Sequence, residues 1–431
     1  MNVYDSARIH EMFAGFGLKS TENIAEADVL LFNGCNIREK AASKLFSDVG
    51  RAKKAQKKVG KKGIYILAGC VGQATHKEAF SRGLDIVVGP RSYHKIPDLL
   101  KEKIQKEKMK LKGGVMDVSF AKNEKFENRK VPQLRTSQSK VSVFLTIQEG
   151  CNKFCRFCCV PYTRGREFSR PVDQIYREAK DFVSQGAREI TLLGQNVSDY
   201  QYKDENQTTR LGNLIRKVSD IEDLWRLRYT TSHPRDIDDE LISAHAEVRK
   251  LMPHLHLPVQ SGSNKLLKEM NRKHSIERYL EIIDQLRKAR PGILFSTDII
   301  VAYPGETEED FQATMDLVEK VKFAQVYSFK YSPRKRTPAA SMVQIPLEVQ
   351  NERLQRLQSL TNKHQEEINK SFIGKTLSVL VEKKGKYKNQ NVGFSQYMQP
   401  VAIDNSTEYF GKIVDVKITE VLAHTLKGEI I

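Results

Sequence analysis

The first 105 residues contain short apolar runs that alternate with amphipathic stretches. A short continuous apolar run is typical of a buried strand, whereas apolar positions repeated every three or four residues are typical of a helix. The expected strands are 29–32, 64–67 and 86–88, and the expected helices lie near 5–16, 37–55 and 92–106. Because strands joined by helices usually pair in parallel, residues 1–105 are predicted to form an N-terminal parallel α/β domain.

The same alternation resumes after a polar segment without periodicity. Residues 106–140 are therefore predicted to be a linker, and residues 141–370 a second α/β domain that ends in a helix near 346–371. Its expected strands are 142–147, 189–193, 225–230, 254–259, 294–302 and 324–331. Helices in the intervals make six consecutive strand–helix units. Such a series predicts a parallel barrel or partial (βα)6 barrel, with its chemistry at the C-terminal ends of the strands.

The last segment, residues 371–431, has a different pattern. Its strand-like runs are 377–381, 401–403 and 413–421, separated by Gly and Asn. These runs predict a small antiparallel β-barrel, a shape often used to hold nucleic acid. The expected fold class is thus α/β, with an N-terminal parallel domain, a partial (βα)6 barrel and a small C-terminal β-barrel.

Composition narrows the classes of protein that remain. The chain has 431 residues, of which 39% are hydrophobic and 29% charged, as in globular proteins. No apolar run reaches the roughly 18–20 residues that a membrane helix needs, and the first residues lack a secretory signal. A cytoplasmic protein without membrane association is expected. The formal net charge of +18 favours a nucleic-acid partner, although a solubilising surface is the alternative.

Four of the six cysteines fall within nine residues: Cys151, Cys155, Cys158 and Cys159. The C-x-x-x-C-x-x-C spacing directly follows the first expected barrel strand, so it lies at the catalytic face. Three thiolates on a four-iron, four-sulfur cluster leave one iron open to a substrate or cofactor. A structural zinc site would need a fourth ligand, and buried structural cysteines are the other alternative. Cys159 is expected to pack rather than share this cluster, because adjacent side chains point in different directions.

Longer motifs make the chain similar to a known family. They are C-C-V-P-Y-T-R-G-R-E at 158–167, L-G-Q-N-V at 193–197, T-S-H-P at 231–234, H-L-P-V-Q-S-G-S at 256–263, D-I-I-V at 298–301, P-G-E-T at 304–307 and Y-S-P-R at 331–334. In this order they resemble the tRNA methylthiotransferases, which are radical S-adenosylmethionine enzymes. The resemblance covers essentially the whole chain, and the C-terminal segment resembles the RNA-binding TRAM domain.

The resemblance implies a cofactor set and a reaction. Cys151, Cys155 and Cys158 would hold the cluster that binds and cleaves S-adenosylmethionine. The reaction implied is methylthiolation of carbon-2 of N6-isopentenyladenosine beside the tRNA anticodon, with an electron donor protein and a sulfur source as further partners and the enzyme as a monomer. The alternatives are methylthiolation of threonylcarbamoyladenosine or of a ribosomal-protein aspartate, or a non-catalytic RNA-binding relative.

Several polar residues at expected strand ends are candidates to bind S-adenosylmethionine. They are Gly194, Gln195, Asn196, Gln260, Ser261 and Asp298. The alternative for each polar side chain is a capped turn or a satisfied hydrogen bond. Arg164 and Arg166 are candidates to bind RNA phosphate or the cofactor carboxylate. Tyr327, Phe329 and Tyr331 share one strand face and are expected to be core residues rather than a base-stacking platform.

The N-terminal domain departs from the family at one point. The resemblance implies a second four-iron, four-sulfur cluster held by three cysteines, and Cys35 and Cys70 match two of them. The third lies in a Gly-Cys-Gln-Met-Asn motif at the end of a first strand, of which the sequence Met-Asn-Val-Tyr-Asp-Ser matches only the tail. Either the start was assigned at an internal Met or the second cluster is not held in the usual way. We expect a truncated start.

Overall fold

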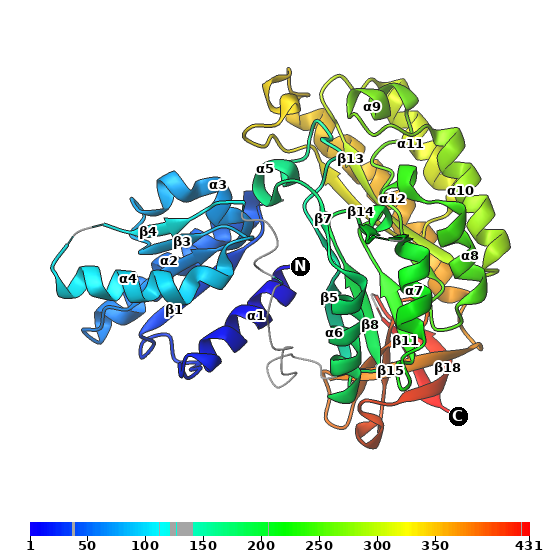
Figure 1. Cartoon of the computed structure of the whole chain (residues 1–431). Coiled ribbons are helices and arrows are strands. Elements are labelled where there is room, and N and C mark those ends of the chain that lie inside the picture. Colours follow the sequence, from blue (N-terminus) through cyan, green and yellow to red (C-terminus); the bar gives the residue numbers. More distant parts are fainter. Residues whose placement is uncertain (37–38, 112, 121–125, 127–140, 206, 424) are drawn as a thin grey trace. The chain divides into compact units, whose positions relative to one another are not determined.

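The computed structural model describes residues 1–431 except 37–38, 112, 121–125, 127–140, 206 and 424 (Figure 1). Contacts divide the chain into two compact units. Unit 1 comprises residues 1–136, 149–168 and 332–340, and unit 2 comprises residues 137–148, 169–331 and 341–431. No helix within the described ranges combines the length and the apolar character needed to cross a bilayer.

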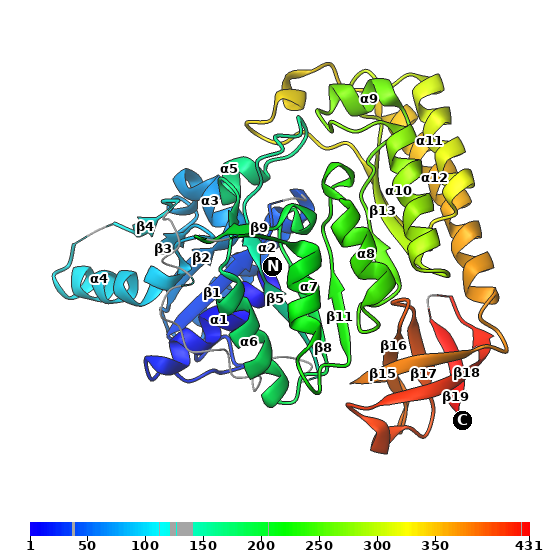
Figure 2. The same cartoon turned by 45° about the vertical axis from the view of Figure 1, so that its right-hand side comes forward.

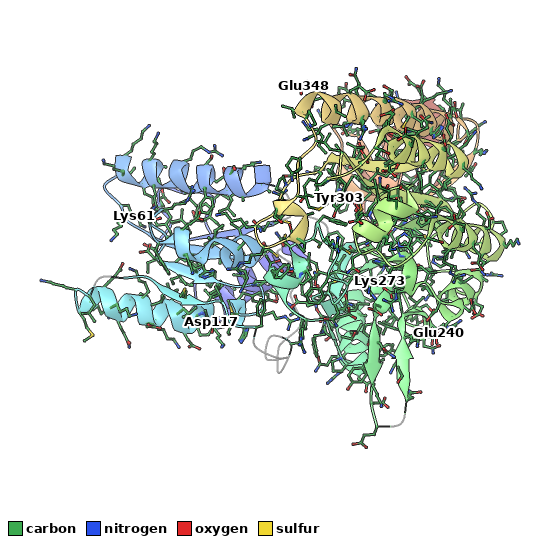
Figure 3. The ribbon with its side chains drawn as sticks, turned by 90° about the horizontal axis from the view of Figure 1, so that it is seen from above. Lys61, Asp117, Glu240, Lys273, Tyr303 and Glu348 are labelled. Atoms are coloured by element: carbon green, nitrogen blue, oxygen red, sulfur yellow. The ribbon has the colours of Figure 1, made fainter. Side chains whose placement is uncertain are left out.

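Unit 1 is built on a four-stranded parallel sheet. The strands, in spatial order, are β1 (Val29–Gly34), β2 (Ile64–Ala68), β3 (Ile86–Val88) and β4 (Val115–Asp117). The helices are α1 (Asn2–Gly15), α2 (Glu39–Lys58), α3 (Gly69–Ala79), α4 (Ile96–Lys108) and the short α5 (Val160–Arg164). Figure 3 shows α2 and α4 on opposite sides of the sheet, with Lys61 just beyond α2. The parallel α/β prediction is confirmed.

Alternation along the strands gives this sheet two apolar faces. Leu67 and Val87 pack with α2 and α3 side chains, whereas their neighbours Ile66 and Ile86 pack with α1 and α4 side chains. Each strand is therefore buried on both sides, which explains its continuous apolar run. Covering both faces with helices is the usual solution for a parallel sheet.

Two elements of unit 1 were not expected. Helix α3 begins with Gly-Cys-Val-Gly, and glycines disfavour a helix. Gly72 is nevertheless required there, because a Cβ atom would lie 2.6 Å from the carbonyl oxygen of Val88. Strand β4 falls within the segment assigned to a linker, where three residues are too few to show alternation. Most of the remaining linker segment lies outside the described residues.

Unit 2 contains the six predicted parallel strands in two groups of three. Their bounds are β5 (Ser142–Thr146), β8 (Glu189–Leu193), β11 (Arg226–Tyr229), β12 (His254–His256), β13 (Leu294–Val301) and β14 (Gln325–Lys330). The helices are α6 (Val172–Ser184), α7 (Leu211–Ser219), α8 (Asp239–Glu247), α9 (Asn264–Glu269), α10 (Ile276–Ala289), α11 (Glu308–Val321) and α12 (Leu347–Lys370), and the short strands are β6 (Gln148–Glu149), β7 (Phe168–Ser169), β9 (Gln201–Lys203) and β10 (Thr208–Arg210). The order β11-β8-β5 and β12-β13-β14, with helices between strands, confirms the partial barrel (Figure 2).

The C-terminal strands close into a five-stranded barrel. They are β15 (Thr376–Lys384), β16 (Asn391–Ser395), β17 (Pro400–Ile403), β18 (Ile413–Val421) and β19 (Leu426–Ile430), in the order β15-β16-β17-β19-β18. The barrel prediction is confirmed, but the expectation of purely antiparallel pairing is wrong, because β17 and β19 are parallel. An odd number of strands cannot alternate in direction around a closed ring, so one pair must be parallel.

Two buried arginines at the start of β11 attach this barrel to the rest of unit 2. Arg226 donates to the carbonyl oxygens of Phe394 and Ser378, both at 2.8 Å. Arg228 donates at 3.0 Å to the carbonyl oxygen of Ser395 and at 3.0 Å to the carboxylate of Glu189. The barrel is therefore joined by a buried polar network in addition to apolar packing.

We expect Arg226→Met to loosen the C-terminal barrel, because it leaves two buried carbonyl oxygens without donors. The cost should be about 3 kcal/mol. Limited proteolysis should then cut the connection between α12 and β15 much faster than in the wild type. Arg177→Met on α6 is the matched control, since Arg177 is exposed and its guanidinium donates to the carbonyl of Asp173 in its own helix. Equal cutting rates in the two variants would contradict this role.

Three histidines of unit 2 should make the unfolding free energy depend on pH. Burial lowers the pKa of His245 to about 3, of His254 to about 3 and of His274 to about 4. The unfolded chain then binds more protons, so stability is lost as the pH falls below about 6.5 towards about 3. Burial instead raises the pKa of Glu306 to about 7, which adds stability as the pH falls from about 7 to about 4.5.

Two substitutions separate these opposing effects in urea unfolding of the apoprotein. His245→Gln keeps an amide beside the Tyr229 hydroxyl, 2.7 Å from the His245 Nε2 atom, and cannot titrate. It should reduce the stability lost between pH 7 and pH 5 by about 2 kcal/mol. Glu306→Gln should increase the stability that is lost between pH 7 and pH 5, because the glutamine cannot take up the proton that stabilises the wild type as the pH falls. The same pH dependence in both variants and the wild type would exclude these groups as its source.

Candidate functional site

The cysteine loop of unit 1 runs from the end of β6 to the start of α5. The Cys151 amide donates to the carbonyl of Gly165 at 3.2 Å, and the Cys158 amide to the carbonyl of Cys155 at 2.9 Å. Gly150 has a φ of +78°, and a Cβ atom there would lie 2.1 Å from the carbonyl oxygen of Arg166. Only glycine allows this close approach, which closes the loop at its base.

The three predicted cluster cysteines lie near one another in this loop. Cys155 is buried, and Cys151 and Cys158 are half-buried. The pKa of Cys151 is raised to about 11, mainly by burial and in part by the neighbouring Cys155. Burial raises the pKa of Cys158 as well, again with Cys155 as the nearest like charge. Three thiolates in so small a space repel each other, so they need a cationic centre to hold them together.

Cys35 and Cys70 lie at one edge of the unit 1 sheet. Cys35 directly follows β1, and Cys70 is the second residue of α3, directly after β2. These strands are neighbours, and a further bridge joins Gly34 to Gly69. The carboxyl ends of parallel strands meet at the same edge, which is where such folds place their chemistry. The backbone therefore brings these two cysteines to one place, although they are 35 residues apart in the sequence.

A buried arginine connects α5 with α1 and α3. Arg164 donates to Asp5 at 3.0 Å, to Glu149 at 3.2 Å and, through Nε, to the Cys70 sulfur at 3.3 Å. Its side chain is 4% exposed, so it is not available to RNA phosphate. That part of the sequence expectation is wrong, because tertiary packing surrounds the guanidinium with acids from distant segments. Arg166, two residues later, is exposed.

The donor set of the cysteine loop fits an iron–sulfur cluster better than a single ion. Among the residues that the structure describes, no three Cys, His, Asp or Glu side chains converge closely enough to hold one metal ion. Three soft thiolates from one short loop are the ligand type that iron–sulfur clusters use. The chemistry of the donor set therefore fits a cluster.

In unit 2, the residues after β8 are held by a buried glutamine. A Cβ atom on Gly194 would lie 2.6 Å from the side-chain oxygen of Gln148, so a larger residue there would displace the Gln148 side chain. The Asn196 amide donates to that same oxygen at 3.1 Å, and the Asn196 side chain donates to Asp236 at 2.7 Å. Asn196 is almost completely buried. The described hydrogen bonds of Asn196 therefore fix the turn after β8. Gln195 is half-buried at the tip of this turn.

A second polar group lies on β12 to β14. The backbone of Gln260, with a φ of +78°, donates to the carbonyl of Asp298 at 2.9 Å. The Asp298 carboxylate lies 3.5 Å from His256 Nε2, and the Tyr327 ring stands edge-on to His256 at 5.7 Å. Ser261 is fully buried, and its hydroxyl accepts from the Ser263 amide. His256, Asp298 and Tyr327 are partly exposed, so they form a polar surface that a ligand can reach.

Comparison with family models divides the chain into three parts. Residues 145–318 match the Radical SAM superfamily, residues 1–89 match Uncharacterized protein family UPF0004, and residues 370–431 match the TRAM domain. The first and third matches agree with the segments in which the structure has a partial (βα)6 barrel and a closed β-barrel.

Full-length relatives give the family. The chain is 50% identical over 439 residues to tRNA-2-methylthio-N(6)-dimethylallyladenosine synthase from Rickettsia canadensis, covering 100% of this chain and 97% of the relative. It is 51% identical over 433 residues to the protein of the same name from Wolbachia pipientis wMel, covering 99% and 96%. The chain belongs to the tRNA-2-methylthio-N(6)-dimethylallyladenosine synthase family. The resemblance read from the motifs is confirmed.

Solved structures of radical enzymes share the fold of this family member. The methyltransferase TsrM from Kitasatospora setae, with cobalamin and a [4Fe-4S] cluster bound, aligns with a TM-score of 0.58 at 13% identity, covering 78% of this chain and 71% of TsrM. The cobalamin-dependent enzyme OxsB aligns with a TM-score of 0.54 at 13% identity, covering 84% and 54%. At such identities the likeness shows the fold alone.

The structure places the predicted site residues of the synthase family member in two groups. All five predicted cluster cysteines lie in unit 1, and the six predicted cofactor residues lie in unit 2. Gln260 and Asp298 are hydrogen-bonded neighbours, whereas Asn196 and Ser261 have the buried hydrogen bonds that the alternative interpretation described. Tyr327 was expected in the core but is 41% exposed, whereas Tyr331, expected there with it, is buried.

Sequence reasoning missed Gln148 and His256. Gln148 directly precedes the cysteine loop and contacts both Gly194 and Asn196. His256 opens the quoted H-L-P-V-Q-S-G-S motif, so its place at the end of a predicted strand was a usable signal. For Gln148 no comparable signal exists, since its role depends on a partner 46 residues away.

Proposed function

We propose that this protein replaces the hydrogen on carbon-2 of N6-isopentenyladenosine in tRNA with a methylthio group. Membership in the synthase family at 50% identity over the whole chain is the observation that carries the proposal. The C-terminal barrel and the net charge of +18 support a polyanionic substrate.

The first cofactor site is assigned to Cys151, Cys155 and Cys158. When bound there, a four-iron, four-sulfur cluster with one iron free of protein ligands supplies the reductive cleavage of S-adenosylmethionine. The three thiols lose their protons on ligation, and the surrounding protein excludes water from the sulfurs. A second cluster, on Cys35 and Cys70, is assigned to the sulfur that becomes the methylthio group.

The barrel residues are assigned to binding and positioning S-adenosylmethionine. The turn at Gly194, Gln195 and Asn196 is fixed by Gln148, so its half-buried tip is preorganised for a polar ligand. Gln260, Ser261 and Asp298 present a second set of polar groups. His256 lies beside the Asp298 carboxylate, and the Tyr327 ring packs edge-on against His256. We further propose that the protein is a cytoplasmic monomer. It would work with an electron donor protein and a sulfur source.

The test is substrate selection by the reconstituted protein. Anaerobically loaded full-length protein should methylthiolate tRNA that carries isopentenyladenosine, and should leave tRNA that lacks the isopentenyl group unchanged. Digestion of the tRNA to nucleosides and mass spectrometry measure both outcomes. Equal activity on tRNA that carries threonylcarbamoyladenosine would instead assign the protein to methylthiolation of that nucleoside. Modification of a ribosomal-protein aspartate with no tRNA product would overturn the proposal.

A further inference from the structure

Cys159 lies where two distant segments of unit 1 meet. It is buried and occupies the residue before α5, directly after the first cluster's third cysteine. Its sulfur donates to the carbonyl oxygen of Asn36 at 3.8 Å, and Asn36 is the residue next to Cys35. Two segments 123 residues apart therefore meet at this thiol.

The helix that follows Cys159 also leads to Cys70. Helix α5 packs against α3, the helix that carries Cys70, and lies beside it in both views (Figures 1 and 2). Arg164, at the other end of α5, donates to the Cys70 sulfur at 3.3 Å. Cys159 therefore directly precedes a short helix that packs against α3 and contacts Cys70, while its own sulfur contacts the residue next to Cys35. All of these residues belong to unit 1.

Hydrogen bonds separate Cys159 from the rest of the cysteine loop. The Cys158 amide donates to the carbonyl of Cys155 within the loop. The Cys159 sulfur instead contacts the carbonyl of Asn36, in the segment that follows β1. The Cys159 thiol therefore lies beside the segment that carries Cys35.

We propose that Cys159 is a thiolate ligand of the second cluster, together with Cys35 and Cys70. The three thiols come from separate segments: the end of β1, the start of α3 and the residue before α5. The proposal rests on the second cluster of the proposed function, and it adds a ligand from outside the N-terminal α/β segment. Each thiol releases its proton on binding, and no electron is gained or lost by the protein.

Three such thiols suit a cluster more than a lone ion. Soft thiolates without imidazole or carboxylate partners favour iron–sulfur clusters. Arg164 Nε lies 3.3 Å from the Cys70 sulfur, so a positive charge stands beside this thiol.

The test uses full-length protein in which Cys151, Cys155 and Cys158 are replaced with Ala, so that only the second cluster can form. After anaerobic reconstitution it should retain about four irons per chain. Adding Cys159→Ser should lower the iron and sulfide content to the same extent as adding Cys35→Ser or Cys70→Ser. Thr163→Val is the matched control, because it alters a buried polar residue on the same helix without removing a thiol, and it should retain the iron.

A second measurement counts the thiolates directly in the apoprotein of the same background. Titration with cadmium alone should give sulfur-to-metal charge-transfer absorption for three thiolates, and Cys159→Ser should reduce that absorption by about one third. The proposal is overturned if Cys159→Ser keeps the iron and the cadmium absorption while Cys35→Ser loses both. If no variant of this background binds iron, including its parent, then the second cluster of the proposed function fails instead.

Discussion

Replacing Cys151, Cys155 and Cys158 together with Ala is expected to abolish cleavage of S-adenosylmethionine. The cofactor carries the difficult chemistry, and the three thiols of one loop are its assigned attachment. Formation of 5′-deoxyadenosine under reducing conditions should fall by at least about 1,000-fold, which is roughly 4 kcal/mol of activation free energy. Liquid chromatography of the nucleoside product measures this directly, without tRNA and without the second cluster.

The matched control for this experiment is Arg177→Met, which changes an exposed residue of α6 and should cleave the cofactor at the wild-type rate. Iron content should fall in the triple variant by about four atoms per chain and stay constant in the control. Cofactor cleavage by the triple variant at the rate of the control would show that these thiols do not hold the reactive cluster.

Replacing Arg164 with Met is expected to destabilise unit 1 by about 3–5 kcal/mol. The guanidinium is buried between Asp5 and Glu149, and the substitution removes a cation that contacts both buried carboxylates. Hydrogen exchange of the amides in α1 and α3 should speed up by a factor of at least about 100, because 1.4 kcal/mol corresponds to a factor of ten. Arg164→Lys should restore only part of the protection, since an ammonium cannot contact both carboxylates as a fork does.

Arg166→Met serves as the control for Arg164→Met. Arg166 is exposed, and its described contacts use its backbone carbonyl, which accepts from Arg91. Its replacement should change stability by less than about 0.5 kcal/mol. If Arg164→Met and Arg166→Met lose the same hydrogen-exchange protection, then the stability of unit 1 depends on charge near the loop and not on the buried network of Arg164.

Local patterns predicted the elements of this molecule well. The six parallel strands of unit 2 and three of the five barrel strands could be read from apolar runs, whereas β16 and β19 were missed. The C-x-x-x-C-x-x-C spacing likewise identified the cysteine loop without any tertiary information. What failed depended on closure or on neighbours. The parallel pair β17–β19 follows from ring closure, and Tyr327 is more exposed than the apolar pattern of its strand predicted.

Tertiary partners of single residues were beyond the sequence. Arg164 looked like an anion-binding residue because it stands beside the cysteines, yet Asp5 comes from α1, 159 positions away, and buries it. Cys159 was expected to be a packing residue, and only the fold brings it to Asn36 and Cys70. Such long-range contacts are determined by how α1, α3 and α5 pack, which no local periodicity reports.

Transfer of a labelled methyl group tests the central claim most directly. The reconstituted protein is given tRNA containing isopentenyladenosine and S-adenosylmethionine whose methyl group carries deuterium, and the nucleosides are weighed by mass spectrometry. We predict an adenosine product that has gained sulfur together with a fully deuterated methyl group, and no such product from the Cys151→Ala variant. Iron-loaded wild-type protein that cleaves the cofactor but leaves this tRNA unmodified would contradict the account.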